Sequence, residues 1–150
     1  METKRILLVE DSDLDAELVL AALAAAKVGH GVLHVADGAE ALDYLFRRGS
    51  FATLDEGQPL LVLLDLKLPK VDGIEVLRQV KADPELRMIP IVVMSSSKEN
   101  RDISESYRLG ANAYVVKPVN SERLADVVKQ IGLFWLLVNE PPTGAAGGPQ

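Results

Sequence analysis

The sequence contains no cysteine, few aromatic residues and no long apolar run. Without cysteine, disulfides, thiol nucleophiles and cysteine-based zinc sites are all excluded. The apolar stretch nearest the start, Ile6 to Val9, is too short for the core of a signal peptide. No stretch approaches the roughly 20 apolar residues that a membrane span needs. These absences predict a cytoplasmic protein with no membrane partner.

Basic residues are also in deficit. The chain carries 16 Lys and Arg against 22 Asp and Glu, a formal net charge of -6. Proteins that bind nucleic acid usually carry a basic patch that neutralises phosphates. A nucleic-acid partner is therefore not expected, and no appended output domain is recognisable in the sequence.

The residues that are present fit one folded domain. Apolar residues make up 48% and charged residues 25% of the 150 positions, as in globular proteins. We expect one domain over residues 4–138 and a disordered tail over residues 139–150, which are rich in proline and glycine. A polar insertion from Gly49 to Pro59 is expected to be a solvated loop.

Short apolar runs alternate with helical patterns five times along the chain. The alternation predicts a doubly wound α/β fold with a five-stranded parallel sheet, helices on both faces and the flavodoxin-like strand order 2-1-3-4-5. The second run contains a histidine, which suits an edge strand. The five runs are Ile6–Val9, Val32–Val35, Leu60–Leu64, Ile91–Met94 and Ala113–Val116. The stronger helical stripes are Leu14, Leu18, Ala22, Ala25; Ala41, Leu42, Leu45, Phe46; Ile74, Leu77, Val80, Lys81; and Leu124, Val127, Val128, Ile131, Trp135, Val138.

Acidic residues follow the first and third predicted strands. Glu10 and Asp11 end the first strand and Asp65 ends the third. Ligands of such folds bind at the carboxyl ends of the strands, where the strand order reverses. Three converging carboxylates repel one another unless a cation neutralises them, and an oxygen-only ligand set suits Mg²⁺. The sequence therefore predicts a Mg²⁺ site at this edge.

The other two strand ends add a hydroxyl and a cation. Ser95 ends the fourth strand and Lys117 ends the fifth. A carboxylate nucleophile, a metal ion, a lysine and a hydroxyl donor are the parts that accept a phosphoryl group. Taken singly, Asp11 is equally consistent with a helix cap, Asp65 with a turn, and Ser95 and Lys117 with solvated surface groups. Their joint occurrence at consecutive strand ends carries the prediction.

At these residues the chain resembles the receiver domains of bacterial response regulators. The match rests on Leu8-Val9-Glu10-Asp11, Leu64-Asp65-Leu66-Lys67-Leu68-Pro69 with Asp72-Gly73, Met94-Ser95-Ser96, and Tyr114-Val115-Val116-Lys117-Pro118. It covers about residues 4–138. The chain is also similar to the stand-alone regulators that partner phytochrome-type histidine kinases, through Leu66–Pro69, the insertion and the aromatic Gly132-Leu133-Phe134-Trp135 end.

The resemblance implies a role for each matched residue. Asp65 is expected to accept a phosphoryl group from a sensor histidine kinase, and Lys117 and Ser95 to bind that group. The narrower similarity implies a bacteriophytochrome as this kinase. Asp11 and Asp65 are expected to bind Mg²⁺ directly, Glu10 to act mainly through a water, and the backbone carbonyl of Lys67 to complete the protein ligands. Tyr114 is expected to be an aromatic switch coupled to Ser95, and the Lys117–Pro118 bond to be cis. Such a protein catalyses only its own phosphorylation and dephosphorylation.

Two other functions remain open from the residues alone. A phosphohydrolase of the haloacid dehalogenase type also uses a strand-end aspartate, but needs a second aspartate where Lys67 stands. A degenerate receiver would act only as a scaffold, against which the retained site residues argue. A flavodoxin-like cofactor domain is disfavoured because no phosphate-binding loop follows the first strand.

The end of the last predicted helix is apolar on more than one face. Its stripe suffices to cover the sheet, which leaves four further apolar side chains, Leu133, Phe134, Leu136 and Leu137. If these side chains were exposed, they would form an apolar patch of several hundred Å², which is unusual for a monomer. It predicts a symmetric homodimer through this end of the helix, the alternative being that some of these side chains fold back onto the domain.

Overall fold

The computed structural model describes residues 6–28 and 31–137. Its five strands form one parallel sheet in the order β2-β1-β3-β4-β5, as the alternation of runs predicts. The strands are β1 (Ile6–Val9), β2 (Val32–Val35), β3 (Leu61–Asp65), β4 (Ile91–Ser95) and β5 (Ala113–Val116). The helices are α1 (Asp13–Ala25), α2 (Gly38–Phe46), α3 (Gly73–Ala82), α4 (Asn100–Arg108), α5 (Ser121–Gln130) and the single turn α6 (Phe134–Leu137).

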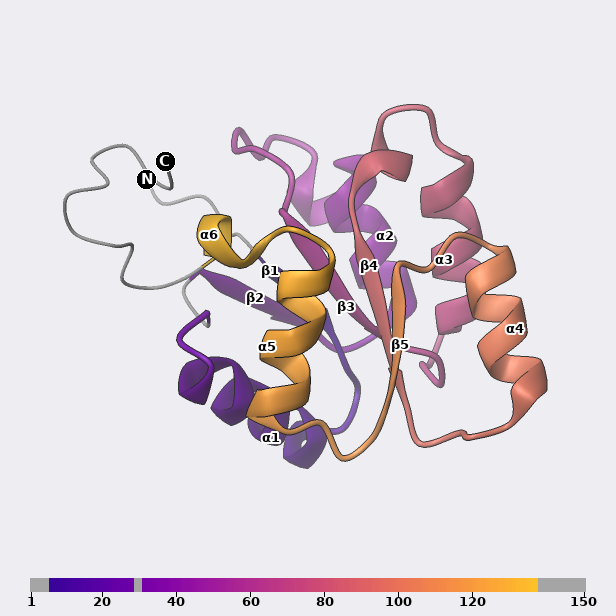
Figure 1. Ribbon diagram of the computed structural model, residues 1–150. Coiled ribbons are helices and arrows are strands. Elements are labelled where there is room, and N and C mark those ends of the chain that lie inside the picture. Colours follow the sequence, from indigo (N-terminus) through magenta and orange to yellow (C-terminus); the bar gives the residue numbers. More distant parts are fainter. Residues whose placement is uncertain (1–5, 29–30, 138–150) are drawn as a thin grey trace, which may run out of the picture.

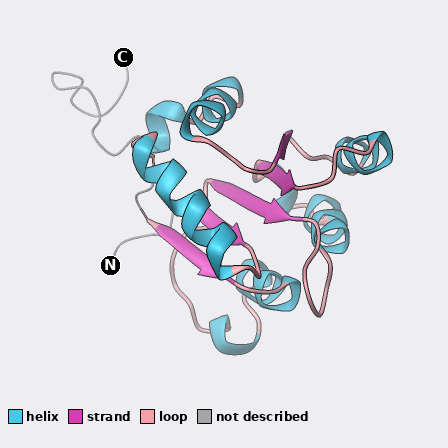
Figure 2. Cartoon of the chain, turned by 90° about the horizontal axis from the view of Figure 1, so that it is seen from below, coloured by secondary structure: helices cyan, strands magenta, loops and turns pink. Residues whose placement is uncertain are grey.

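Helices cover both faces of the sheet. α1, α5 and α6 lie on one face, and α2, α3 and α4 lie on the other (Figures 1 and 2). The central strands β1, β3 and β4 are buried along their whole length, so they read as continuous apolar runs in the sequence. β2 is half-buried and lies at the edge, which confirms the expectation drawn from its histidine.

Helix starts are fixed by capping side chains. Ser12, Asp37, Asp72 and Asn120 each accept a hydrogen bond from the backbone amide three residues later. These caps begin α1, α2, α3 and α5 directly after loops that leave the carboxyl edge of the sheet. The loops that carry functional side chains are thus fixed at their far ends.

The predicted stripe of α1 is wrong except at Ala22. Leu14 and Leu18 are 66% and 50% exposed, and the residues that the helix buries are Ala16, Val19, Ala22 and Leu23. Alanine and leucine occur on every side of this helix, so the sequence period does not select a face. Packing against the sheet and α5 makes that selection.

The last helix is shorter than the periodicity predicts. α5 ends at Gln130, and Gly132 adopts a φ of 78°, which starts a turn before α6. The chain then folds back, because Leu133 is 9% exposed and Leu137 is fully buried in the core of the α1–α5 face. The single long stripe through Trp135 and Val138 was therefore a wrong prediction: the glycine breaks the helix. Val138 and the predicted tail, 139–150, lie outside the described residues.

The insertion is not simply a solvated loop. It contains a 3-10 turn, Gly49–Phe51, whose Phe51 ring packs edge-on against Tyr44 at 5.2 Å. The hydroxyl of Tyr44 donates to Glu56 at 2.8 Å, and the guanidinium of Arg47 donates to the carbonyl of Glu56 at 2.9 Å. These contacts tie the insertion to α2.

In the part of the chain that the structure describes, no helix is long and apolar enough to cross a membrane.

Candidate phosphoryl-acceptor site

The predicted site residues meet at the carboxyl edge of the sheet. Val9 pairs with Leu64 and Asp65 pairs with Met94, so the residues that follow β1 lie beside the end of β3. Ser95 pairs with Val116 across β4 and β5, which brings Lys117 to the same edge. The parallel register therefore brings together side chains that are up to 107 residues apart in the sequence.

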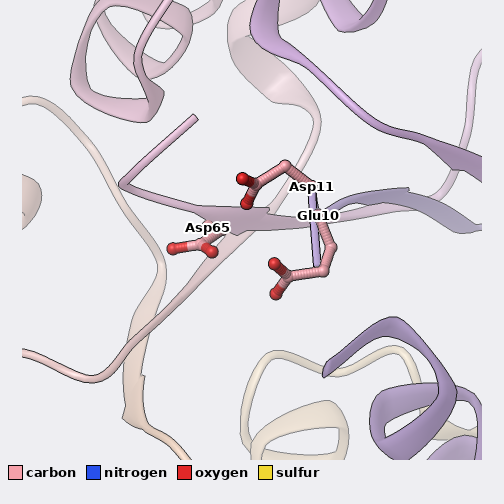
Figure 3. A group of neighbouring side chains, drawn as sticks. All are labelled: Glu10, Asp11 and Asp65. Carbon is pink, nitrogen blue, oxygen red and sulfur yellow. The ribbon is translucent and has the colours of Figure 1, made fainter. Parts of the chain in front are cut away.

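Three carboxylates converge in this site. Ligand oxygens of Glu10, Asp11 and Asp65 all lie within 4.8 Å of one another, and their side chains point into a common space (Figure 3). Glu10 is fully buried and Asp65 is 6% exposed, whereas Asp11 is exposed. Buried like charges this close require cationic partners. Oxygen donors that open to solvent on one side fit a hard divalent cation.

Lys117 supplies the fixed cation. Its Nζ donates to Glu10 Oε1 at 2.6 Å, Asp65 Oδ2 at 3.0 Å and Asp15 Oδ2 at 3.0 Å. Burial lowers the pKa of Lys117, but the hydrogen bonds to the three carboxylates outweigh it and raise the pKa above its ordinary value. The lysine is thus a permanent positive charge at the site, and its peptide bond to Pro118 is cis, as expected.

Glu10 lies beneath the site rather than at its mouth. Burial raises the pKa of Glu10, against the lowering effects of Lys117 and of the Ser12 amide, which donates to Oε2 at 3.1 Å. With Oε1 engaged by Lys117 and Oε2 by Ser12, both carboxylate oxygens have a partner. This arrangement holds Glu10 in place and agrees with an indirect role toward a metal.

The loop after Asp65 is held by close backbone contacts. The amide of Lys67 donates to Asp65 Oδ1 at 3.2 Å, and the amide of Gly73 donates to the carbonyl of Leu66 at 2.8 Å. A Cβ at Gly73 would lie 2.1 Å from the carbonyl oxygen of Asp65, so only glycine fits there. These contacts fix the backbone of Asp65. The predicted ligand role of the Lys67 carbonyl stays a prediction.

Ser95 and Tyr114 are connected through one residue, Ser97. Ser95 is 1% exposed, and its Oγ accepts a hydrogen bond from the amide of Ser97 at 3.1 Å. The hydroxyl of Tyr114, a residue that is 6% exposed, donates to the carbonyl of Ser97 at 3.0 Å. Ser97 also anchors α4, because its Oγ donates to Asp102 Oδ2 at 2.5 Å. The serine at the site is therefore two hydrogen bonds away from Tyr114.

Sequence reasoning missed one residue near the site, Asp15. Asp15 contacts Lys117 from α1, although its position three residues after Ser12 only suggests a helix-capping role. His34, interpreted from the sequence as structural, has its Nε2 2.7 Å from the carbonyl oxygen of Glu10. In β2 it lies one residue before Val35, whose carbonyl accepts from the Glu10 amide. It thus supports the backbone that carries the acids.

The structure buries part of the predicted dimer surface and leaves part of it exposed. Leu133 and Leu137 are buried within the chain's own core, so the expectation that they are exposed is wrong. The turn at Gly132 allows this fold-back. Leu136 is 50% exposed, and the side chain of Phe134 lies outside the described residues.

Comparison with known proteins identifies the family. The family model that describes the response regulator receiver domain matches residues 6–129 of this chain. The chain belongs to the response regulator receiver family. It is therefore a phosphoacceptor signalling protein, and the family match decides against a phosphohydrolase.

The receiver resembles regulators that work with phytochromes. It is 41% identical to response regulator Rcp1 of Synechocystis sp. (strain ATCC 27184 / PCC 6803 / Kazusa) over 133 residues, 89% of each chain. The structure of bacteriophytochrome response regulator RtBRR is 51% identical, with a TM-score of 0.83 over 97% of this chain and 88% of that chain. The phosphorylated cyanobacterial phytochrome response regulator RcpA is 44% identical, with a TM-score of 0.74 over 99% of this chain and 100% of that chain. Rcp1 has also been crystallised in a Mn²⁺-bound form, which agrees with an acidic metal site in this receiver.

Proposed function

We propose that Asp65 of this receiver accepts a phosphoryl group from a histidine kinase. The observation that carries the proposal is the contact of Lys117 Nζ with Asp65 Oδ2 at 3.0 Å, beside the acidic cluster. An Asp65 oxygen attacks phosphorus, the bond from phosphorus to the donor histidine nitrogen breaks, and its electron pair stays on the imidazole. The product is an acyl phosphate on Asp65, and Lys117 neutralises part of the charge on the transferred group.

The metal in this proposal is Mg²⁺. Asp11 and Asp65 would hold it directly, Glu10 through a water, and the Lys67 carbonyl would complete the protein ligands. The bound cation supplies charge neutralisation for the phosphoryl oxygens. The support is the hard-oxygen donor set and the mutual distance of the three acids, within 4.8 Å.

Phosphorylation would be read out through Ser95. A phosphoryl oxygen that accepts from Ser95 Oγ draws this hydroxyl away from the Ser97 amide. The carbonyl of Ser97 accepts from Tyr114, and the Ser97 hydroxyl donates to Asp102 of α4. Movement of Ser97 would therefore change the surface of α4, β5 and α5.

The size of this change limits which contacts can drive it. Moving a switch from 1:99 to 99:1 needs about 5.5 kcal/mol of differential interaction. One charge-assisted hydrogen bond contributes about 1.5–3 kcal/mol. The hydroxyl of Ser95, the ammonium of Lys117 and the metal contacts must therefore act together.

The kinase would dock on the exposed apolar side of α1. Leu14 and Leu18 are 66% and 50% exposed, and Leu18 lines a pocket of about 270 Å³ with Ser96, Lys117 and Pro118. A phosphohistidine donor must approach Asp65 from this side of the carboxyl edge, where apolar contacts hold the two proteins together. By their names, the relatives act in phytochrome signalling, which supports a phytochrome-type kinase as the partner.

The receiver would also form a symmetric dimer through the end that follows α5. Since Leu133 and Leu137 are buried, the contact would rest on Leu136, which is half-exposed. A smaller apolar contact of this kind gives a weaker dimer than the sequence suggests.

Acetyl phosphate with Mg²⁺, followed by intact mass, tests the phosphoacceptor proposal. We expect one added phosphoryl group, dependent on Mg²⁺ and absent in Asp65→Asn. Asp55→Asn is the matched control, because Asp55 is exposed in the insertion and should leave phosphorylation unchanged. Phosphorylation that persists in Asp65→Asn would contradict the proposal, and no phosphorylation of the wild type would favour the scaffold.

A further inference from the structure

Lys117 has a third carboxylate partner that the phosphoryl-transfer chemistry does not use. Asp15 Oδ2 lies 3.0 Å from Lys117 Nζ, at the same distance as Asp65 Oδ2. Asp15 belongs to the first turn of α1 and reaches Lys117 across the loop that follows β5. It is not a member of the acidic cluster of Glu10, Asp11 and Asp65.

The local sequence predicts a helix-capping role for the Asp15 carboxylate, but the structure does not show it in that role. Serine with an acid three residues later is the pattern of a capping box, in which the acid accepts from the amide of the serine. The first half is present, because Ser12 Oγ accepts from the Asp15 amide at 3.2 Å. The Ser12 amide, however, donates to Glu10 Oε2 at 3.1 Å. The Asp15 carboxylate is thereby left to pair with Lys117.

The ammonium of Lys117 has no spare donor. It carries three N–H groups, and these donate to Glu10, Asp15 and Asp65. A phosphoryl oxygen that pairs with Lys117 must therefore displace one of these carboxylates. The partners differ in whether water could replace the lost contact with Lys117. The Glu10 side chain is fully buried and cannot regain water, whereas the Asp15 side chain is 38% exposed and can. Asp65 itself carries the phosphoryl group, so Asp15 is the partner that leaves.

Release of Asp15 does not remove its charge from the site. The carboxylate stays on the first turn of α1, whose start is fixed by Ser12, while the phosphoryl group adds about -1.5 to -2 charges. Both the lost ion pair with Lys117 and the remaining repulsion oppose the phosphorylated state. We propose that Asp15 is a positioning residue that holds Lys117 before phosphorylation and competes with the phosphoryl group for it afterwards. The inference rests on the proposed role of Asp65.

The affinity for BeF₃⁻ tests this competition at equilibrium. BeF₃⁻ coordinates an aspartate oxygen and presents its fluorines where the phosphoryl oxygens would lie. We would titrate it at saturating Mg²⁺ into the wild type, Asp15→Asn and Asp15→Glu, and follow bound fluoride by ¹⁹F NMR. Asp13→Asn is the matched control, because it removes the same charge from the same turn of α1, while Asp13 is exposed and is not one of the three carboxylates that accept from Lys117.

Asp15→Asn is expected to bind BeF₃⁻ about 3- to 10-fold more tightly than the wild type, the order expected for removing one like charge at a partly solvated site. Asp13→Asn should change the affinity less than about 2-fold, and Asp15→Glu should restore affinity toward that of the wild type. Damage to the fold would weaken binding, so tighter binding separates competition from a structural role. An unchanged or weaker affinity in Asp15→Asn, with wild-type binding intact, overturns the role of Asp15 alone. Failure of the wild type to bind BeF₃⁻ at all overturns the assignment of Asp65 and this inference with it.

Discussion

Gly73→Ala is the substitution whose effect the structure specifies most directly. Gly73 begins α3, and its amide donates to the carbonyl of Leu66 at 2.8 Å. An added Cβ would lie 2.1 Å from the carbonyl oxygen of Asp65 and 2.6 Å from the Cα of Leu66. All the atoms that it would meet belong to the backbone, so no side chain can rotate away.

The expected effect follows from the displacement required. Relieving these contacts moves the loop after β3 away from α3 by about 1 Å. Overpacking of this kind costs about 1–3 kcal/mol. Because the nearest atoms belong to the backbone, which adjusts less easily than a side chain, we expect Gly73→Ala to lower the free energy of unfolding by about 3 kcal/mol. A domain of this size has about 5–15 kcal/mol in total. The same displacement misplaces Asp65, and a shift of about 1 Å can slow a reaction about 100-fold.

Urea unfolding followed by circular dichroism measures the first effect, and the rate of phosphorylation by acetyl phosphate measures the second. Gly132→Ala is the matched control. Its φ of +78° strains any other residue, but a Cβ there would meet no atom within 4 Å. It should cost about 1 kcal/mol and leave phosphorylation unchanged. If Gly73→Ala unfolds at the same urea concentration as the wild type, or is phosphorylated at the same rate, the contact between Gly73 and the Asp65 backbone does not constrain the site.

Four further outcomes are expected. Ser95→Ala should abolish the phosphorylation-dependent change in hydrogen exchange of α4, because the link to Ser97 is lost; an intact change would contradict the switch. Leu137→Ala should lower the free energy of unfolding by about 2 kcal/mol, since truncating this fully buried leucine leaves a cavity in the core. Leu136→Ala should cost less than about 0.5 kcal/mol but weaken self-association in sedimentation, and a monomeric wild type at high micromolar concentration would refute the dimer. Burial, and then the hydrogen bond to Glu56, raises the pKa of Tyr44 to about 12. The stabilisation that Tyr44 contributes should therefore be fully present below pH 10 and be lost as the pH rises through about 12. Absorbance at 295 nm would follow the titration of the phenol, and thermal unfolding of the wild type and Tyr44→Phe across this pH range would measure the change in stability.

Much of the fold was predictable because strands that are buried on both faces form continuous apolar runs in the sequence. Ile6–Val9 and Ile91–Met94 contain only apolar residues, and each lies within one residue of the strand observed. The helix faces were less predictable. From Leu18 to Ala25, α1 contains only apolar residues, and the neighbours that bury Val19 rather than Leu18 come from other parts of the chain.

The site was predictable to the extent that its residues stand at strand ends. Asp65, Ser95 and Lys117 could be grouped, because parallel strands bring their carboxyl ends to one edge. Asp15 could not, because it lies within α1 rather than at a strand end and its local pattern matches a helix cap. Its carboxylate turns to Lys117 only because Glu10 takes the amide that a cap would have used.

By itself, the sequence determined the order of strands and helices and the chemistry available at the strand ends, since both follow from local patterns and from the geometry of parallel sheets. Tertiary structure decided which face of α1 is exposed, where the chain after Gly132 turns back, and which three carboxylates share Lys117. Each of these depends on competition among partners for one surface or one donor. That competition exists only when distant segments are packed together, so no local pattern records its outcome.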